Sequence, residues 1–376
     1  LGAYPTTKGA LPHILTGERY LNNVPFNKYI EEAYKNTILY DTLISNGYDI
    51  GINVSKIFLP SNSADIFRNV IDKSAKPTSY MNLGLMMYKS TAFSYFPHIL
   101  KERFWFYSGD FDKYIDISNN KTASKTLSKD DIVFYNSLIE EGLTFDNDSY
   151  AFRVYHLHGV HPPYRMTSQL TYDDNGTSIM EESLGSLNVV LEYISQLKKA
   201  GLYDQTSIIV MADHGGVDYR QNPMLMVKAM NNSADFRISS APISYDDLLN
   251  TMLWLATGDD RYEPNVFSWN ENDIRIRKYW YYDWDNSWDK DYLPDIYEYI
   301  TDSSSIDMQK MNKTGTVYTS SGIKNNFFVK VSLGEKLQFP NGGKIQGAFV
   351  YGFSSDEGTH IWSLGKKAKL SFALEN

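Results

Sequence analysis

The sequence predicts an α/β protein with a mostly parallel central sheet flanked by helices, followed by a small β-rich domain. Between about residues 151 and 216, an apolar strand, a polar loop, a long helix, a second apolar strand and a second polar loop follow one another, which is the βαβ order of a parallel sheet. Beyond about residue 300, short β-type runs are separated by Gly, Asn and Ser. We therefore expect an α/β body over residues 1–300, a linker that includes Asn312 to Gly315, and a β-sandwich-like domain over residues 316–376.

Two segments have the hydrophobic period of helices. Residues 27–46 predict one helix, with Asn46-Gly47 as a plausible C-cap, and residues 178–200 predict a long amphipathic helix that Gly201 ends. The first apolar stripe consists of Ile30, Tyr34, Ile38, Leu39 and Leu43, and the second of Leu184, Leu187, Leu191, Ile194 and Leu197.

Two apolar strands each end in a polar cluster. Residues 151–157 predict a buried strand before the loop HGVHPPY, and residues 207–212 predict a strand that ends at Asp213-His214-Gly215-Gly216. Ligand-binding groups of parallel sheets collect at the carboxyl ends of strands, so both clusters are candidate sites.

Composition excludes several classes of protein. The 376 residues are 42% hydrophobic, which is enough to bury a sizeable core. With 36 Lys and Arg against 45 Asp and Glu, the net charge of −9 argues against a nucleic-acid backbone as the main partner. The absence of cysteine excludes disulfides, thiolate metal sites and a cysteine nucleophile.

Two patterns of membrane and secreted proteins do not occur in this sequence. No run of about 18 apolar residues occurs, and the first residues lack the basic-then-apolar plan of a secretory signal. Because the chain opens with Leu1 rather than Met, we expect it to be part of a longer protein.

Asp213 and His214 are candidate metal ligands, because a carboxylate oxygen and an imidazole nitrogen side by side can share one divalent ion. The alternative is an ordinary turn with a solvated imidazole. The position directly after an apolar strand, before two glycines that permit a tight turn, makes the two interpretations about equal.

Three of the seven histidines lie within six residues, at His156, His158 and His161. Clustered imidazoles at a strand end favour a polar site, since imidazole binds metals and carries protons near neutral pH. For His156, inside the strand, a hydrogen-bonded core histidine is the preferred interpretation. For His161, before two stiffening prolines, a functional role is preferred.

The third candidate is the hydroxyl of Thr7, in the segment from Thr6 to Gly17. A hydroxyl at a helix start lies where backbone N–H groups and the helix dipole favour an alkoxide or a phosphate. Ordinary N-capping by Thr is the commoner use of such a residue. Pro12 is compatible with a helix that begins around Lys8 or Gly9.

Together and in this order, Thr7 with Pro12 and Gly17, then GVHPPY, then TSIIVMADHGG resemble the alkaline phosphatase and sulfatase superfamily. The match is closest to the bacterial membrane-anchored phosphoethanolamine and phosphoglycerol (lipoteichoic-acid-synthase-like) transferases, and it covers roughly residues 1–260. The resemblance implies an alkaline-phosphatase-like fold for that part of the chain.

The resemblance also implies roles for individual residues. Thr7 matches the nucleophile, which is also a metal ligand, and Asp213 and His214 match metal ligands, for one Zn²⁺ or Mn²⁺. His161 matches the residue that contacts the phosphate or the leaving group. From their chemistry rather than from the resemblance, His158, Arg165 and Lys228, with Arg220 nearby, are expected to bind the phosphoryl group of the substrate; solvation is the usual alternative for exposed basic side chains.

Two departures from the superfamily pattern matter. Sulfatases open their motif with an oxidised Cys or a Ser, followed by Pro and Arg, whereas residues 7–11 read TKGAL; sulfate-ester hydrolysis by that route is excluded. The family's acidic metal ligand at the end of the first core strand lies upstream of Thr7, before this chain begins. We expect that ligand, and membrane helices, in the preceding part of the protein.

Two further segments have alternatives of their own. The last 28 residues resemble a β-sandwich segment of bacterial glycan-assembly enzymes. The matching positions are Gly352-Phe353-Ser354, Glu357, His360 and Trp362-Ser363. The aromatic run 278–288 could stack on sugars, but a core or a domain junction is the preferred use of these rings.

The sequence thus predicts a metal-dependent phosphotransferase that moves phosphoethanolamine or phosphoglycerol from a lipid donor to a glycan or lipid acceptor of the cell envelope, through a phosphothreonine. It is expected at the extracytoplasmic face of a bacterial membrane. The alternatives are a metal-dependent phosphodiesterase or sulfatase-like hydrolase, and a non-catalytic glycan-binding protein.

Overall fold

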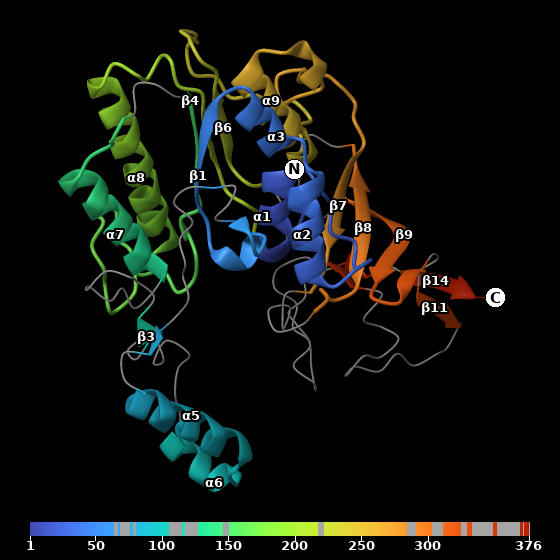
Figure 1. Ribbon diagram of the computed structural model, residues 1–376. Helices are drawn as coiled ribbons and strands as arrows, with labels where there is room; N and C mark the ends of the chain where they lie inside the picture. The colour runs from blue at the N-terminus through green and yellow to red at the C-terminus, as the bar shows by residue number, and fades with distance from the viewer. Residues whose placement is uncertain are drawn as a thin grey trace. The chain divides into compact units, whose positions relative to one another are not determined.

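Helices and strands are interspersed along the chain, as the α/β class requires (Figure 1). The computed structural model describes residues 1–63, 67, 76–77, 80–104, 115–116, 127–145, 150–216, 222–283, 291–302, 311–324, 329–332, 349–351, 369–370 and 372–375. The chain divides into two compact units. Unit 1 consists of Leu1–Tyr48, Phe58–Asn62 and Thr206–Asn376, and unit 2 of Asp49–Ile57 and Ser63–Gln205.

The α-helices among the described residues are α1 (Thr7–Thr16), α2 (Phe26–Asn36), α3 (Leu39–Ser45), α5 (Tyr80–Tyr95), α6 (His98–Lys101), α7 (Leu127–Glu140), α8 (Ile179–Lys199) and α9 (Leu248–Thr257). Single 3₁₀ turns are η1 (Lys56–Phe58), η2 (Glu102–Phe104), η4 (Tyr245–Asp247) and η5 (Asp260–Tyr262).

The strands are β1 (Tyr48–Asn53), β2 (Lys76–Pro77), β3 (Ile115–Asp116), β4 (Tyr150–Tyr155), β5 (Ile208–Met211), β6 (Leu225–Lys228), β7 (Arg277–Tyr281), β8 (Ile296–Thr301), β9 (Asn312–Thr319), β10 (Gly322–Lys324), β11 (Val329–Ser332), β12 (Phe349–Tyr351), β13 (Lys369–Leu370) and β14 (Phe372–Glu375).

Helix α1 of unit 1 begins at Thr7, one or two residues earlier than predicted. Pro12 is therefore its sixth residue and lies beyond the first turn, where it cannot donate an N–H to the helix. Thr16 Oγ1 donates to the Pro12 carbonyl at 2.7 Å, and Gly17 ends the helix with a φ of 76°. The helix is buried from Lys8 to Thr16, so the surrounding unit holds it in place despite the proline.

The helix predicted over residues 27–46 is divided into α2 and α3. Thr37 is extended, and its Oγ1 accepts the N–H of Leu39 at 3.3 Å, so its side chain replaces a helical hydrogen bond. Of the predicted stripe, Ile38 at the break is 50% exposed and the other members are buried. Gly47, with a φ of 79°, ends α3 as predicted.

A four-stranded antiparallel sheet in the order β10-β9-β8-β7 forms the other part of unit 1. Tyr279 on β7 pairs with Tyr299 on β8, and both rings are buried together with Met311. Trp280 is buried too and stacks on Tyr4, with ring centroids 5.6 Å apart. The preferred interpretation of the aromatic run as core is confirmed for its described part; residues 284–288 lie outside the described residues.

The predicted linker from Asn312 to Gly315 is wrong, because these residues belong to β9 and pair with β8. The antiparallel sheet therefore crosses the expected boundary between residues 300 and 316, and the two compact units follow a different division. Short strands do occur beyond residue 316, with β11 parallel to β14 and β12 antiparallel to β13. Residues 352–368, which carry the β-sandwich resemblance, lie outside the described residues.

Unit 2 contains the two-stranded pair of β1 and β4 and the helices α7 and α8 (Figure 1). Helix α8 agrees with the prediction at both ends: Ser178 Oγ accepts the N–H of Glu181 at its start, and Gly201 with a φ of 71° follows its end. Its core contact agrees with the predicted stripe only in part. Leu197 of that stripe is buried, but Leu184 and Leu191 are 43% and 60% exposed, and Val189, which lies outside the stripe, is buried.

The predicted central parallel sheet is only partly visible in the described residues. Strand β5 pairs with β6 in antiparallel register, and β4 pairs with β1. Both predicted buried strands are less buried than expected: β5 is half-buried throughout, and β4 alternates between exposed and half-buried positions. Each therefore has a face that its own unit does not fully cover.

Candidate functional site

The hydroxyl group predicted to be the nucleophile lies at the N-terminus of α1. Thr7 is the first residue of the helix and is half-buried. Thr6 is the N-cap residue, with an extended backbone, but its side chain accepts no hydrogen bond from the helix. Its Oγ1 lies instead 2.6 Å from the hydroxyl of Tyr282. The helix start is therefore attached to the segment that follows β7.

Tyr282 supplies the cap that Thr6 does not. Its hydroxyl accepts the N–H of Gly9, the third residue of the helix, at 3.1 Å. An N-cap side chain normally accepts an N–H at this position. Because the Tyr282 oxygen accepts from Gly9, its own proton can be donated to Thr6 Oγ1. Gly9 permits this approach, since a Cβ atom there would lie 3.0 Å from the Tyr282 oxygen and 2.8 Å from the Tyr4 ring.

Asp213 and His214 follow the end of β5, as predicted. The end of the β5–β6 hairpin is held by Tyr245, whose hydroxyl donates to the carbonyl of Ala212. The N–H of Ala212 donates to the Met224 carbonyl at 3.0 Å, which closes the hairpin just before Asp213. Tyr245 is buried in η4, which is itself capped by Ser244. This arrangement fixes the backbone that carries the two predicted metal ligands.

Asp213 and the start of α1 act on the same tyrosine. Burial raises the pKa of Tyr282; hydrogen bonds from Thr6 and Gly9 lower it, and the charge of Asp213 raises it further. Burial and then Asp213 likewise raise the pKa of Tyr245. The carboxylate thus lies within electrostatic range of the hydroxyl that contacts Thr6. The start of α1 and the end of β5 both belong to unit 1.

The Asp213-His214 pair fits part of a metal site. His214 Nδ1 donates to the Gly215 carbonyl at 2.7 Å, because a carbonyl oxygen can only accept. This bond leaves Nε2 as the unprotonated nitrogen of the neutral ring, the form that binds metals. Nε2 lies 3.7 Å from Asp213 Oδ1. Two tetrahedral ligands at Zn²⁺ distances of about 2.1 Å lie about 3.4 Å apart, so the donor atoms suit one ion.

The described residues hold no group of three or more His, Cys, Asp or Glu that could bind a metal ion. The predicted site therefore has two ligands of that kind, Asp213 and His214. The hydroxyl of Thr7, in the same unit, is the predicted third donor. The assignment of Thr7, Asp213 and His214 to one ion stays a prediction.

The histidine loop belongs to unit 2 and is held by the start of α7. Asp131, which is buried, accepts the N–H of His158 at 2.9 Å and that of Gly159 at 2.7 Å. His158 Nε2 lies 3.1 Å from Asp130 Oδ2, so this imidazole is paired with a carboxylate. His156 is half-buried, and its N–H donates to Asn53.

His161 is the most accessible of these imidazoles. It is exposed, and its Nδ1 donates to the Pro162 carbonyl at 2.6 Å, which leaves Nε2 to accept a proton. Nε2 is the accessible nitrogen, and when it carries a proton it can donate to a phosphoryl oxygen or to a leaving oxygen, as the predicted contact requires. That role stays a prediction.

The basic side chains predicted to bind phosphate contact the backbone. The Arg165 guanidinium donates to the carbonyls of Asp173 and Asp174, and Lys228 Nζ donates to those of Thr206 and Ala229. Both contacts stabilise loops or strand ends. Arg220 lies outside the described residues.

Sequence reasoning missed Tyr282, Tyr245 and the contact of the α1 residue His13 with Asp246, which Arg19 also binds. His13 is buried, and its Nε2 lies 3.2 Å from Asp246 Oδ1, to which Arg19 also binds at 3.0 Å. Burial opposes ionisation of Asp246, but the hydrogen bond from His13 and the charge of Arg19 outweigh it and lower its pKa to about 2. Asp246 directly follows Tyr245, so its contact with His13 ties α1 to the segment that supports Asp213.

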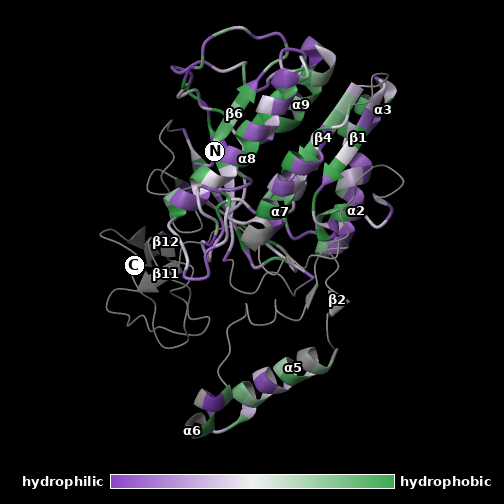
Figure 2. Cartoon of the chain, turned by 90° about the vertical axis from the view of Figure 1, so that its left-hand side faces the viewer, coloured by the Kyte–Doolittle hydropathy of each residue, from purple (hydrophilic) through white to green (hydrophobic). Residues whose placement is uncertain are grey.

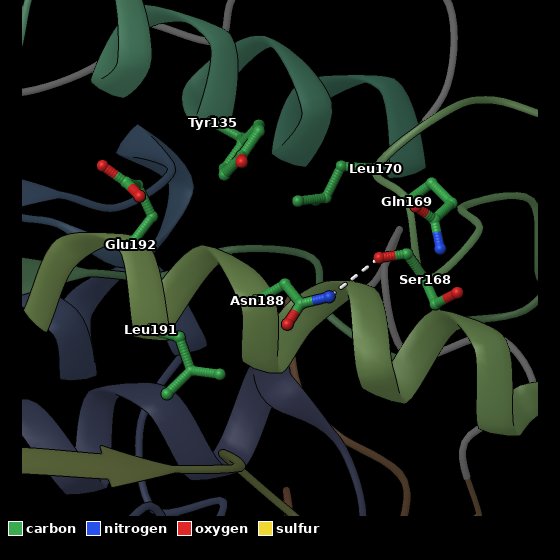
Figure 3. Close-up of a pocket in the computed structure, with 7 residues that line it drawn as sticks. All are labelled: Tyr135, Ser168, Gln169, Leu170, Asn188, Leu191 and Glu192. Carbon is green, nitrogen blue, oxygen red and sulfur yellow. Dashed lines mark hydrogen bonds between the residues drawn. The ribbon is translucent and has the colours of Figure 1, made fainter. Parts of the chain in front are cut away.

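A groove of about 330 Å³ lies between α7 and α8 of unit 2. Figure 3 shows Tyr135 and Leu170 on one side of it and the side chain of Asn188 turned toward Ser168, whose carbonyl accepts its amide at 2.8 Å. None of the residues predicted for the site lines this groove. It is a separate feature of unit 2.

No protein-family model matches the chain, and neither does any curated protein. Among solved structures, the chain is similar to Ps i-CgsB in complex with k-i-k-neocarrahexaose, at 14% identity, with 82% of this chain and 73% of that one covered and a TM-score of 0.44. Ps i-CgsB in a second crystal structure gives 14% identity, 80% and 73% coverage and a TM-score of 0.43. A candidate sulfatase, yidJ from Bacteroides fragilis, gives 13% identity, 86% and 78% coverage and a TM-score of 0.42. At these values the likenesses assign no activity to this chain.

Proposed function

We propose that this protein is a metal-dependent phosphotransferase that moves a phosphoethanolamine or phosphoglycerol group from a lipid to a cell-envelope glycan or lipid, through a phosphothreonine at Thr7. The observation that carries the proposal is the position of Thr7 as the first residue of α1, next to a cap residue that Tyr282 binds, with Asp213 in electrostatic range of the same tyrosine. A nucleophile, an acidic group and a helix N-terminus are the parts that phosphoryl transfer needs.

Each side chain has a stated part in the transfer. Asp213, His214 and Thr7 would hold one Zn²⁺ or Mn²⁺, with the acidic ligand expected upstream. When bound, the ion would lower the pKa of the Thr7 hydroxyl and draw charge from a phosphoryl oxygen. The N-terminus of α1, which has no acidic residue in its first turn, favours the negative charge of the phosphoryl group.

The transfer has two steps. Thr7 Oγ1 forms a bond to phosphorus as the bond from phosphorus to the lipid oxygen breaks, and the leaving oxygen gains a proton. An acceptor hydroxyl then forms the new bond to phosphorus, releases Thr7 and gives up its proton. Overall, one proton passes from the acceptor hydroxyl to the released lipid alcohol. His161 has the predicted role of contacting the phosphoryl oxygens or protonating the leaving oxygen.

The test is covalent labelling of the intact protein as the cell makes it. With Mn²⁺ or Zn²⁺ and phosphatidylethanolamine or phosphatidylglycerol, the mass of the protein should rise by one phospho-headgroup. Thr7→Ala should abolish the adduct, and Thr6→Ser, which keeps the hydroxyl that contacts Tyr282, should retain it. Full turnover by Thr7→Ala would refute the nucleophile.

Product analysis with and without a glycan acceptor separates the possible reactions. A transferase gives the headgroup-modified glycan, whereas a hydrolase gives the free phospho-headgroup at the same rate in both samples. Glycan binding with no adduct and no product would identify a non-catalytic binder and overturn the proposal.

A further inference from the structure

Helix α5 of unit 2 exposes an unusual number of large apolar side chains. Tyr95 is 85% exposed, Met81 77%, Tyr88 and Met87 each 59%, and Leu85 58%. Soluble proteins expose single apolar residues commonly, but contiguous apolar patches mark contact sites. Figure 2 shows hydrophobic residues on successive turns of α5.

Four of these side chains lie on one face of the helix. At 100° per residue, Met81, Leu85, Tyr88 and Tyr95 fall within an arc of about 80°. Met86, about 140° from Met81, is buried on the opposite side of α5, and the small side chain of Ala92, which falls within the arc, is buried as well. Phe104 of η2 contacts the rings of Tyr88 and Phe96, with centroids 6.3 and 5.2 Å apart. The segment Tyr80–Phe104 is thus folded against itself, with Phe104 beside Tyr88, and the four large side chains of the outer face of α5 each remain more than half exposed.

The charge around this face differs from that of the whole chain. Helix α5 contains no acidic residue, and the segment Tyr80–Phe104 has three basic residues against one acidic residue, in a chain of net charge −9. Lys89 lies on α5 itself and Arg103 is exposed in η2, while Lys101 packs over the Phe93 ring at 5.5 Å. Exposed Tyr, Met and Leu side chains beside basic groups are complementary to a surface whose outer layer is negatively charged and whose next layer is apolar.

We propose that the outer face of α5 binds the surface of a bilayer that contains anionic phospholipid. Met81, Leu85, Tyr88 and Tyr95 enter the region between headgroups and acyl chains, and Lys89 and Arg103 face the phosphates. Among the described residues no helix is long and apolar enough to cross a membrane, so α5 lies along the surface. This contact does not depend on the chemistry at Thr7.

Vesicle co-sedimentation tests the proposal. The wild-type protein should bind vesicles of phosphatidylcholine with phosphatidylglycerol and bind pure phosphatidylcholine vesicles more weakly. The triple variant Met81→Gln, Leu85→Gln, Tyr88→Gln should bind the mixed vesicles at least about tenfold more weakly, because three apolar side chains no longer enter the bilayer. Lys89→Gln with Arg103→Gln should weaken binding to the mixed vesicles alone, and added salt should have the same effect.

Matched control variants distinguish vesicle binding by this face from nonspecific binding by any exposed apolar side chains. Phe236, Ile238 and Ile274 of unit 1 are 79%, 86% and 87% exposed, and changing all three to Gln should leave vesicle binding unchanged. Thr7→Ala should also bind as the wild type does, which distinguishes a failure here from a failure of the proposed function. Circular dichroism checks that the variants are folded.

Two results would overturn the proposal. One is unchanged vesicle binding by the folded triple variant. The other is a wild-type protein that does not bind vesicles but is a dimer by light scattering, while the triple variant is a monomer. In that case α5 would bind a second copy of the chain.

Discussion

Thr6 Oγ1 and the Tyr282 hydroxyl lie 2.6 Å apart although 276 positions separate the two residues in sequence. Since the same hydroxyl accepts the N–H of Gly9, Tyr282 caps α1 from outside the helix. The position of Thr7 therefore depends on a residue from the far end of the α/β body.

Tyr282→Phe should lower both stability and activity. The change leaves the buried hydroxyl of Thr6 without this partner, which costs about 1–3 kcal/mol of unfolding free energy, measured by urea denaturation. If Thr7 is the nucleophile, a displaced helix start should reduce the rate of phosphothreonine formation at saturating lipid by about tenfold or more, with little change in KM.

Tyr279→Phe is the matched control for that change. Tyr279 is also fully buried and lies three residues earlier, but among the described residues its hydroxyl has no hydrogen-bond partner. Its removal should leave stability unchanged or raise it slightly, with no effect on rate. If the two variants lost the same unfolding free energy and the same rate, the hydroxyl of Tyr282 would not position α1.

Gly9→Ala should destabilise unit 1 by about 1–3 kcal/mol, because the new methyl group would meet the ring of Tyr4 and the hydroxyl of Tyr282. Gly84→Ala in α5 is the control. A Cβ atom at Gly84 meets nothing within 4 Å, so alanine there should stabilise the helix by about 0.5–1 kcal/mol. The midpoints of urea denaturation of the two variants should move in opposite directions. A Gly9→Ala protein as stable as the wild type would contradict the close approach of Tyr4 and Tyr282 to Gly9.

The local features of α1 could be predicted from sequence, and its external cap could not. Thr7 at a helix start and Gly17 after its end follow from residue types within one short segment. Tyr282 belongs to the aromatic run 278–288, in which every ring is equally well predicted to be buried. No local sequence pattern shows which of its hydroxyl groups contacts α1. Only the tertiary arrangement distinguishes Tyr282 from Tyr279.

Helical periodicity gave the position of α8 but not its buried side. Of the predicted apolar stripe, Leu197 is buried but Leu184 and Leu191 are exposed, and the core of unit 2 uses Val189, which the stripe does not include. A stripe shows which residues share a face, whereas burial depends on what packs against that face. Thr37 divided the predicted helix 27–46 for a local reason, since its hydroxyl competes for a backbone N–H.

Asp213→Asn and His214→Ala should each weaken binding of Mn²⁺ or Zn²⁺ by about tenfold or more in isothermal titration of the intact protein, because each removes one proposed ligand. His158→Gln is the control, since this imidazole is paired with Asp130 in unit 2. Unchanged affinity in both variants would place the ion elsewhere.

Asp246 should make the protein sensitive to acid. The pKa of this carboxyl is lowered from 3.8 to about 2 in the folded chain, because the contacts of His13 and Arg19 outweigh the effect of burial. A carboxyl whose pKa is lower in the folded state stabilises the fold at pH values above its pKa in the unfolded chain. The contribution of Asp246 to the unfolding free energy, about 2 kcal/mol, is therefore present above about pH 4 and is lost as the pH falls toward 2.

Asp246→Asn should lower the unfolding free energy at pH 7 and reduce the fall of that free energy between about pH 4 and 2. Asp259→Asn removes a carboxylate whose pKa Arg261 also lowers, but solvent screens that pair, so urea titrations of this variant should lose much less of the pH dependence than those of Asp246→Asn. If Asp246→Asn kept the full acid sensitivity, the contact of His13 and Arg19 with Asp246 would not be its source.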